Sequence, residues 1–222
     1  DGDAARRARH LEQARRTRRI GLGITGLADA LVLLGLNYDG EAARAQATRA
    51  MQTIRDAAYR ASIDLAREKG PFPEFAAQPF LASGFCSRLP GDIRDAVALH
   101  GIRNSHLLAI APAGTISLLA NNCSSGIEPI FAAAAERRVL GTDGRYRVHP
   151  VTDHAWQLWR QQGRSGMPPA LVEARQIDPL AHLQMQAARQ PFVDSAISKT
   201  INVAADAPFD RFADLYRQAH AL

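Results

Sequence analysis

A turn of small residues, Pro112-Ala113-Gly114-Thr115-Ile116-Ser117, follows directly on an apolar run, Leu107 to Ala111. The run predicts a buried strand. A helix that begins in the turn directs its free N–H groups and its positive dipole end at one point, and such groups bind phosphate. Gly114 allows close approach to the main chain, and Thr115 and Ser117 each offer a hydroxyl. The pattern alone fits a phosphate loop and an ordinary strand-to-helix turn equally well, and it lacks the lysine of an ATP-hydrolysing loop.

A second candidate follows at Ser124-Ser125-Gly126-Ile127-Glu128-Pro129. Ser125 is suited to cap a helix or contact a ligand, and Glu128 to act as a general base. Pro129 restricts Glu128 to extended or turn geometry, and we favour a structural turn over a reactive site. Cys123 beside it has no histidine nearby in the sequence, so we expect a small buried residue rather than a nucleophile.

For two further patterns we favour a structural interpretation over a functional one. Asp194 and Lys199 suggest an ion pair or acid–base chemistry, but charges on the surface beside a strand explain them as well. Residues 21–26 match G-x-G-x-x-G literally, yet a dinucleotide site needs a buried strand before the glycines. The preceding residues, Arg15 to Ile20, cannot be a buried parallel strand, so we expect a glycine-rich helix start packed closely against a neighbour.

Composition indicates a globular chain of one domain or part of one. The 222 residues are 46% hydrophobic, and no apolar run approaches the roughly 20 residues that span a bilayer. Most of the net charge of +5 lies in residues 1–20, where seven arginines and three acidic residues give +4. We favour genome composition over a nucleic-acid-binding arm as its cause, because no aromatic residue lies among these arginines to stack on bases.

Cysteine and histidine usage predicts neither a disulfide framework nor a metal site. The only cysteines, Cys86 and Cys123, are far apart in the sequence, and the seven histidines are scattered. We therefore expect no metal and a cytoplasmic location.

Helices alternate with isolated apolar strands along the chain, which predicts a helix-rich α/β fold. We expect strands at 107–111 and 195–203 and short strands within 131–148 around the turn at 141–144. An arginine-rich helical lead-in occupies residues 1–19. The expected helices cover residues 4–19, 24–36, 41–69, 90–100, 152–162, 179–189 and 208–222.

Three stretches, RRIGLGITGLADAL, RNSHLLAIAPAGTISLLANNCSSGIEPIF and VDSAISKTINV, resemble the adenosylcobalamin-dependent (class II) ribonucleotide reductase large chain, in the family's order. The resemblance covers essentially the whole sequence as one partial domain, residues 1–222. It implies the later part of a ten-stranded α/β barrel that reduces ribonucleotides to deoxyribonucleotides by a radical mechanism, with adenosylcobalamin as cofactor. It also implies that residues 112–117 bind the phosphates of a ribonucleotide. The expected partners are that substrate and the remaining reductase segments or a second copy, with no membrane and no nucleic acid.

The chain departs from the family's pattern in two ways. Ala113 stands where the family usually has threonine, which removes one hydroxyl donor. The family's N-x-C-x-E radical loop does not occur, and neither Cys86 nor Cys123 corresponds to the redox cysteines. We therefore assign no catalytic residue and expect an interior fragment or truncated product that is inactive alone. The alternative is a non-catalytic nucleotide-binding or protein-interaction remnant of the same fold.

Overall fold

The computed structural model describes residues 2–204 and 206–222, and its residues fall into two compact units. Unit 1 contains the chain up to Gly23 together with Thr48–Ile110 and Gln190–Ile197. Unit 2 contains Ile24–Ala47, Ala111–Arg189 and Ser198–Leu222. Each unit thus joins segments that are distant in the sequence, and a single domain over residues 1–222 stays a prediction.

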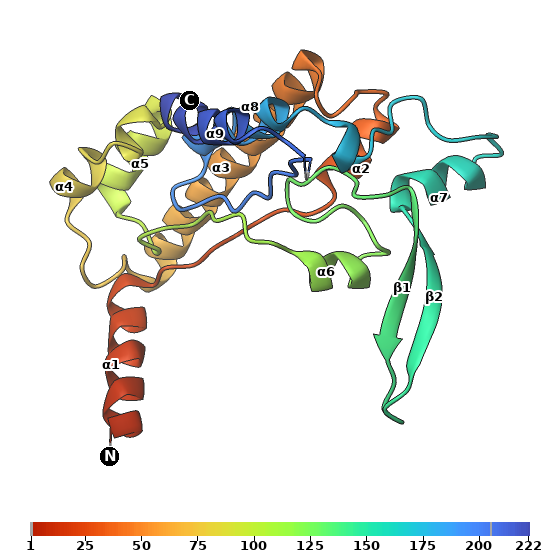
Figure 1. Cartoon of the computed structure of the whole chain (residues 1–222). Helices are drawn as coiled ribbons and strands as arrows, with labels where there is room; N and C mark the ends of the chain where they lie inside the picture. The colour runs from red at the N-terminus through yellow and green to blue at the C-terminus, as the bar shows by residue number, and fades with distance from the viewer. Residues whose placement is uncertain (1, 205) are drawn as a thin grey trace. The chain divides into compact units, whose positions relative to one another are not determined.

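Helices dominate unit 1 (Figure 1). Its longest element is α3 (Glu41–Lys69), which has the predicted bounds and buries an apolar stripe that includes Met51, Tyr59 and Ile63. Gly70 ends this helix at φ 78°, a left-handed conformation that glycine adopts without strain. The other helical elements are α1 (Gly2–Thr17), α4 (Ala77–Leu81), η1 (Cys86–Arg88), α5 (Gly91–His100) and η3 (Gln190–Phe192).

Three extended segments of unit 1 pair in parallel. Leu22 forms a bridge with Leu108, and Ile110 forms a bridge with Ile197, so the segment around Leu108 lies between the other two. Leu108 and Ile110 are buried, as the predicted strand requires, although the pairing is limited to isolated bridges. Parallel pairing between segments so distant in sequence is typical of α/β proteins.

The glycines before α2 pack as the sequence indicates. A Cβ atom added to Gly23 would lie 2.8 Å from the carbonyl oxygen of Ala109, so the predicted close approach is confirmed. The exclusion of a buried parallel strand over Arg15 to Ile20 is confirmed. Ile20 and Leu22 donate their N–H groups to His106 and Leu107 in parallel pairing, while both side chains remain about half exposed.

Unit 2 contains the only strands with a regular ladder among the described residues. β1 (Ala134–Leu140) and β2 (Tyr146–Thr152) form an antiparallel hairpin in which Ala134 pairs with Thr152 and Leu140 pairs with Tyr146 (Figure 1). The predicted short strands around residues 141–144 are thus confirmed. The other elements are α2 (Leu27–Leu33), the first turns of α3, α6 (Gly114–Leu119), α7 (His154–Gln161), η2 (Ala174–Gln176), α8 (Pro179–Ala187) and α9 (Phe209–Ala221).

Helix contacts and caps explain most of the remaining boundaries of unit 2. α2 packs against α7, and α8 packs against α9. The helix expected over 24–36 is shorter, because Gly26 (φ 79°) and Gly35 (φ 72°) take left-handed conformations at its two ends. The expected strand at 195–203 was wrong beyond Ile197, since residues 198–203 form no ladder. The helices expected at 4–19, 90–100, 152–162, 179–189 and 208–222 are confirmed to within two residues, residues 1 and 205 lying outside the described part.

The part of the chain that the structure describes includes no helix long and apolar enough to cross a membrane.

Asp194 fixes the central extended segment of unit 1. Its Oδ2 accepts hydrogen bonds from the Leu107 N–H at 2.9 Å and the Tyr59 hydroxyl at 2.8 Å, and its Oδ1 accepts from the Leu108 N–H at 2.8 Å. The surface-charge interpretation of Asp194 was therefore wrong. A half-buried carboxylate here replaces the backbone partners that a fuller sheet would supply.

Replacing Asp194 by alanine should lower the free energy of unfolding by about 2–4 kcal/mol, because two backbone donors and the Tyr59 hydroxyl lose their acceptor. Urea unfolding followed by circular dichroism measures this change. The matched control is Asp92→Ala, which removes an exposed carboxylate paired with Arg60 in the same unit and should change little. Equal effects of the two substitutions would contradict a special role for Asp194.

Candidate functional site

A helix begins within the predicted phosphate loop 112–117, as the anion-binding hypothesis requires. α6 begins at Gly114 with Ala113 as its N-cap, and the Ser117 N–H makes the first intrahelical bond, to the Ala113 carbonyl at 2.7 Å. The N–H groups of Gly114, Thr115 and Ile116 precede that bond and have no carbonyl to meet within the helix. These three residues are exposed, and a Cβ atom at Gly114 would meet nothing within 4 Å. Three backbone donors thus face open space.

The two hydroxyls of the loop are in different environments. Thr115 is exposed and available to a ligand. Ser117 is only 4% exposed, and its hydroxyl lies 2.8 Å from the Thr25 hydroxyl. The Ser117 side chain is therefore suited to anchoring α6, and a bound anion would meet the Thr115 hydroxyl first.

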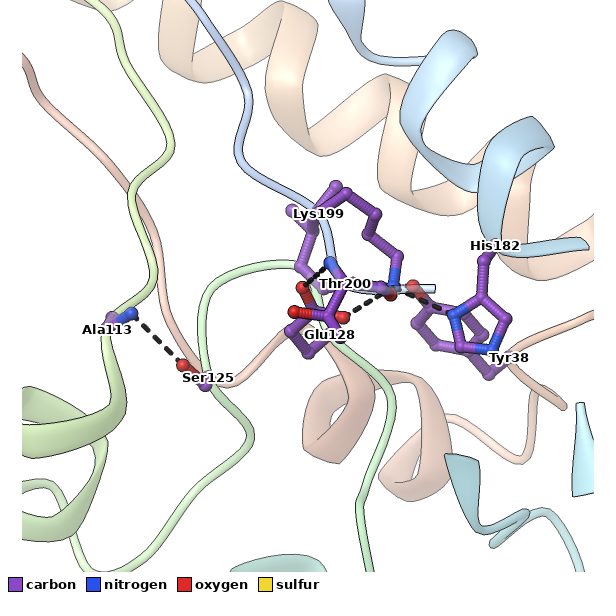
Figure 2. A network of polar contacts seen from close by, with 8 residues as sticks. Tyr38, Ala113, Ser125, Glu128, His182, Lys199 and Thr200 are labelled. Atoms are coloured by element: carbon purple, nitrogen blue, oxygen red, sulfur yellow. Dashed lines mark hydrogen bonds and ion pairs between the residues drawn. The ribbon is translucent and has the colours of Figure 1, made fainter. Parts of the chain in front are cut away.

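Ser125 holds the start of the loop by a hydrogen bond. Its hydroxyl accepts a hydrogen bond from the Ala113 N–H at 3.0 Å (Figure 2). The sequence suggested a cap or a ligand contact for Ser125, and the structure gives it a role in holding a backbone donor just before α6. The Ala113 N–H is thereby used within the protein, and the free donors begin at Gly114.

The segment that carries Ser125 is itself firmly attached. The Ser124 N–H donates to Oδ2 of Asp29 at 2.6 Å, and the Ser124 hydroxyl accepts from the Ala28 N–H at 3.0 Å. Oδ1 of Asp29 accepts from the Ala155 N–H at 3.0 Å, at the start of α7. Asp29 is 3% exposed and so joins three backbone segments inside unit 2.

Glu128 closes the same turn from the other end. Its N–H donates to the Ser125 carbonyl at 2.8 Å, and its Oε1 accepts from the Thr200 N–H at 2.7 Å. Oε2 forms an ion pair with the ammonium group of Lys199, whose side chain is 1% exposed (Figure 2). The favoured structural turn is confirmed, whereas the interpretation of Lys199 as a surface charge was wrong.

The Lys199 ammonium group has an acceptor for each of its three hydrogens. They are Oε2 of Glu128, Nδ1 of His182 at 2.8 Å and the Thr200 carbonyl at 2.7 Å. His182 must therefore accept at Nδ1 and carry its proton on Nε2. Burial, reinforced by the Lys199 charge, lowers the pKa of His182 to about 4, so this imidazole is neutral. Desolvation lowers the pKa of Lys199, and the Glu128 carboxylate opposes that shift.

A cavity of about 230 Å³ lies beside the start of α6. Gly114, Ser125, Cys123, Arg137 and Asp153 contribute to its wall. Cys123 is half-buried, and its sulfur lies 3.8 Å from the Thr25 hydroxyl, which agrees with the expected small packed residue. Arg137 is exposed on β1 and is the one cation of this wall, so it is a possible partner for an anion held by the loop.

Comparison with known proteins identifies the family. Residues 6–222 match the family described as "Ribonucleotide reductase, barrel domain". The chain belongs to this ribonucleotide reductase family.

Two similar proteins are named vitamin B12-dependent ribonucleoside-diphosphate reductases. The one from Mycobacterium tuberculosis (strain CDC 1551 / Oshkosh) is 38% identical over 92% of the chain and 30% of its own length. The one from Thermoplasma acidophilum is 35% identical over 94% of the chain and 27% of its own length. A ribonucleoside-diphosphate reductase large subunit from Arabidopsis thaliana is 34% identical over 65% of the chain and 19% of its own length. The chain thus spans less than a third of the length of each of these three reductases.

The cavities of this ribonucleotide reductase segment are small compared with adenosylcobalamin. Three cavities lined by described residues measure about 230, 400 and 450 Å³. A corrinoid with its adenosyl arm is larger than any of these three cavities, so we assign none of their lining residues to the cofactor. The described residues also include no group of three or more His, Cys, Asp or Glu side chains that could hold a metal ion.

The sequence analysis did not identify Asp29 and His182, whose side chains make buried hydrogen bonds in unit 2. Asp29 reads as one polar residue within an apolar helix, and His182 as an isolated histidine in α8. A charged or polar side chain at an apolar helix position was the only available signal, because its partners lie about 95 residues away for Asp29 and 17 residues away for His182.

Asp153 should make the stability of unit 2 depend on pH. Burial and the nearby Asp29 carboxylate raise the pKa of Asp153 from 3.8 to about 7 in the folded state. The folded chain therefore binds a proton that the unfolded chain has released, and stability falls as the pH rises from about 4 through 7. Asp153→Asn keeps an oxygen to cap α7. At pH 8 its free energy of unfolding should exceed that of the unmodified chain by about 1–2 kcal/mol.

Thermal unfolding of both proteins from pH 4 to pH 8 measures this difference. Subtracting the two profiles removes the contributions of groups that both proteins share, His182 among them. A difference that stays constant across this pH range would contradict a raised pKa for Asp153.

Proposed function

We propose that this chain is part of a ribonucleotide reductase catalytic chain of the vitamin B12-dependent class and supplies the loop that binds the substrate's phosphates. The observation that carries this proposal is the run of free N–H groups at Gly114, Thr115 and Ile116, facing open space at the start of α6. The reaction is reduction of ribonucleotides to deoxyribonucleotides. The proposed substrate is a ribonucleoside diphosphate, because the two B12-dependent relatives are named ribonucleoside-diphosphate reductases.

We further propose that the parallel segments of unit 1 are strands of the ten-stranded α/β barrel that the family resemblance implies. Support comes from the parallel bridges Leu22–Leu108 and Ile110–Ile197, which place three segments side by side in one direction. The loop 112–117 follows the middle segment, at its carboxyl end. Ligands of α/β proteins bind at that end of parallel strands, which fits a substrate site at α6.

The phosphate proposal has a physical basis beyond the resemblance. A diphosphate needs several hydrogen-bond donors that are already oriented, because each donor that must be reordered on binding costs entropy. The Gly114, Thr115 and Ile116 N–H groups are fixed by α6, and the Thr115 hydroxyl is exposed beside them. The hydroxyl that is missing at Ala113 leaves these backbone donors intact, so we expect binding to persist and to be weaker than with threonine there.

The two relatives are named vitamin B12-dependent, and we propose adenosylcobalamin, which the family resemblance implies, as the cofactor that supplies the initiating radical. The thiyl-forming cysteine of the family has no counterpart in this sequence. Burial raises the pKa of Cys86, which keeps that thiol protonated and unreactive. Residues of this chain are therefore proposed to bind and orient the substrate.

A second candidate is a protein-interaction remnant of the same fold. The observation that favours it is the hairpin β1–β2, on which Val139, Leu140, Tyr146 and Val148 are 44–61% exposed. A two-stranded hairpin with apolar side chains in water gains stability from a covering partner. The two candidates differ in one measurable property, since only the first requires a diphosphate to bind at α6.

Gly114→Val should abolish binding of a ribonucleoside diphosphate, because a bulky side chain at this exposed position blocks close approach of a phosphate to the main chain. Isothermal titration calorimetry with cytidine diphosphate measures the affinity. Gly84→Val is the matched control, since Gly84 also has open space around it and lies in unit 1. Unchanged affinity in Gly114→Val, with a folded protein by circular dichroism, would refute the loop as the phosphate site.

The 222-residue chain alone should show no nucleotide reduction with adenosylcobalamin and a dithiol. Its two cysteines lie outside any N-x-C-x-E sequence, so the thiyl radical that abstracts a hydrogen from the ribose has no place to form. Chromatographic detection of deoxynucleotide measures the reaction, with a full-length B12-dependent reductase as positive control. Turnover by the chain alone would overturn this expectation.

A further inference from the structure

We propose that the Glu128–Lys199 ion pair and Ser125 together position the phosphate loop: the pair fixes the turn 125–128, and Ser125 in that turn holds the Ala113 N–H. This inference rests on the proposed phosphate-binding function of residues 112–117. None of the three side chains touches the phosphate in this arrangement. They are positioning residues that set where the free N–H groups of α6 lie.

α6 needs support from outside itself. It has six residues, and an isolated helix of that length is unstable in water. Its N-cap, Ala113, has φ −105° and ψ 34°, and no side chain of the loop caps the helix. Ser117 inside the helix contacts the Thr25 hydroxyl, the Ser124 carbonyl and the Cys123 thiol, and Ser125 holds the Ala113 N–H at its start. Loss of the Ser125 contact therefore frees the end that carries the donors.

The turn that presents Ser125 is fixed at three points. Asp29 holds the Ser124 N–H before it, and the Tyr38 hydroxyl donates to the Ile127 carbonyl at 2.5 Å within it. Lys199 and Thr200 hold the Glu128 carboxylate at its end (Figure 2). Figure 2 shows the Lys199 side chain reaching Glu128 and His182 while the Ser125 hydroxyl points to Ala113, on the far side of the same turn.

The ion pair suits this task because it permits one arrangement. The Glu128 side chain is 10% exposed and the Lys199 side chain 1% exposed, so neither charge can exchange its partner for water. Both carboxylate oxygens and all three ammonium hydrogens have partners in the protein. A buried pair of this kind is not a reliable source of stability, and orienting the chain is a use for which it is well suited.

Hydrogen exchange at the Ala113 amide tests the proposal without any ligand. Ser125→Ala removes the acceptor and should raise the exchange rate of the Ala113 amide at least about tenfold. Ser125→Thr keeps a hydroxyl and should restore slow exchange. Glu128→Gln should also speed exchange at Ala113, although it leaves the Ala113–Ser125 contact chemically intact.

Glu173→Gln is the matched control for loss of a carboxylate. Glu173 also lies in unit 2 and accepts a hydrogen bond from a backbone N–H, that of Ala133 at 3.0 Å, but it makes no contact with the loop. This variant should leave exchange at Ala113 unchanged, whatever it does to the melting temperature. Because Glu128→Gln leaves Lys199 without its partner and is at risk of misfolding, Ser125→Ala serves as the second, independent variant.

Binding of inorganic pyrophosphate provides the functional measurement. Ser125→Ala should weaken it about fivefold, Ser125→Thr should restore it, and Glu173→Gln should leave it unchanged. Normal exchange at Ala113 and normal affinity in folded Ser125→Ala would overturn the inference. If the unmodified chain binds no pyrophosphate, or Gly114→Val binds it equally well, the proposed function fails. Exchange at Ala113 still decides separately whether Ser125 and the pair hold the loop.

Discussion

The burial of one positive and one negative charge imposes the tightest constraint on unit 2. Removing Glu128 and Lys199 from water is costly, and their mutual attraction offsets that cost only with good geometry and satisfied hydrogen bonds. The protein meets this condition with His182, the Thr200 backbone and the two carboxylate oxygens. The segments that supply these groups must therefore keep one relative arrangement, and one of them is the turn 125–128, whose Ser125 holds the Ala113 N–H at the start of α6.

A carboxylate holds irregular backbone at two other places in the chain. In unit 1, Asp194 accepts two backbone N–H groups of a segment that makes only isolated bridges. In unit 2, Asp29 accepts the backbone N–H groups of Ser124 and Ala155. A carboxylate has several acceptor positions, and its hydrogen bonds to backbone donors are stronger than neutral ones. Asp29, Glu128 and Asp194 thus supply acceptors for backbone N–H groups, as neighbouring strands do in a sheet.

These fixed loops make sense in a ribonucleotide reductase barrel. Binding residues commonly lie on loops that a rigid scaffold positions. Here three free N–H groups begin α6, and in the turn that supports them Gly126, Ile127 and Glu128 are buried and Ser125 is half-buried. The donors are open to a ligand while their support is closed to water. That division lets a site bind an anion without reorganising, which is the physical advantage of a preorganised loop.

The sequence by itself determined the helices, the hairpin and the family. Regular apolar spacing and glycine ends located α3 to the residue, because these signals are local. The family resemblance likewise rested on contiguous motifs, and the family match over residues 6–222 confirms it. Only the tertiary structure decided the partners of Asp29, Glu128, Asp194 and Lys199, since each partner lies 71 to 135 residues away for at least one bond. A charged residue looks the same in sequence whether it faces water or a buried partner, and the energy that distinguishes the two cases arises only when distant segments meet.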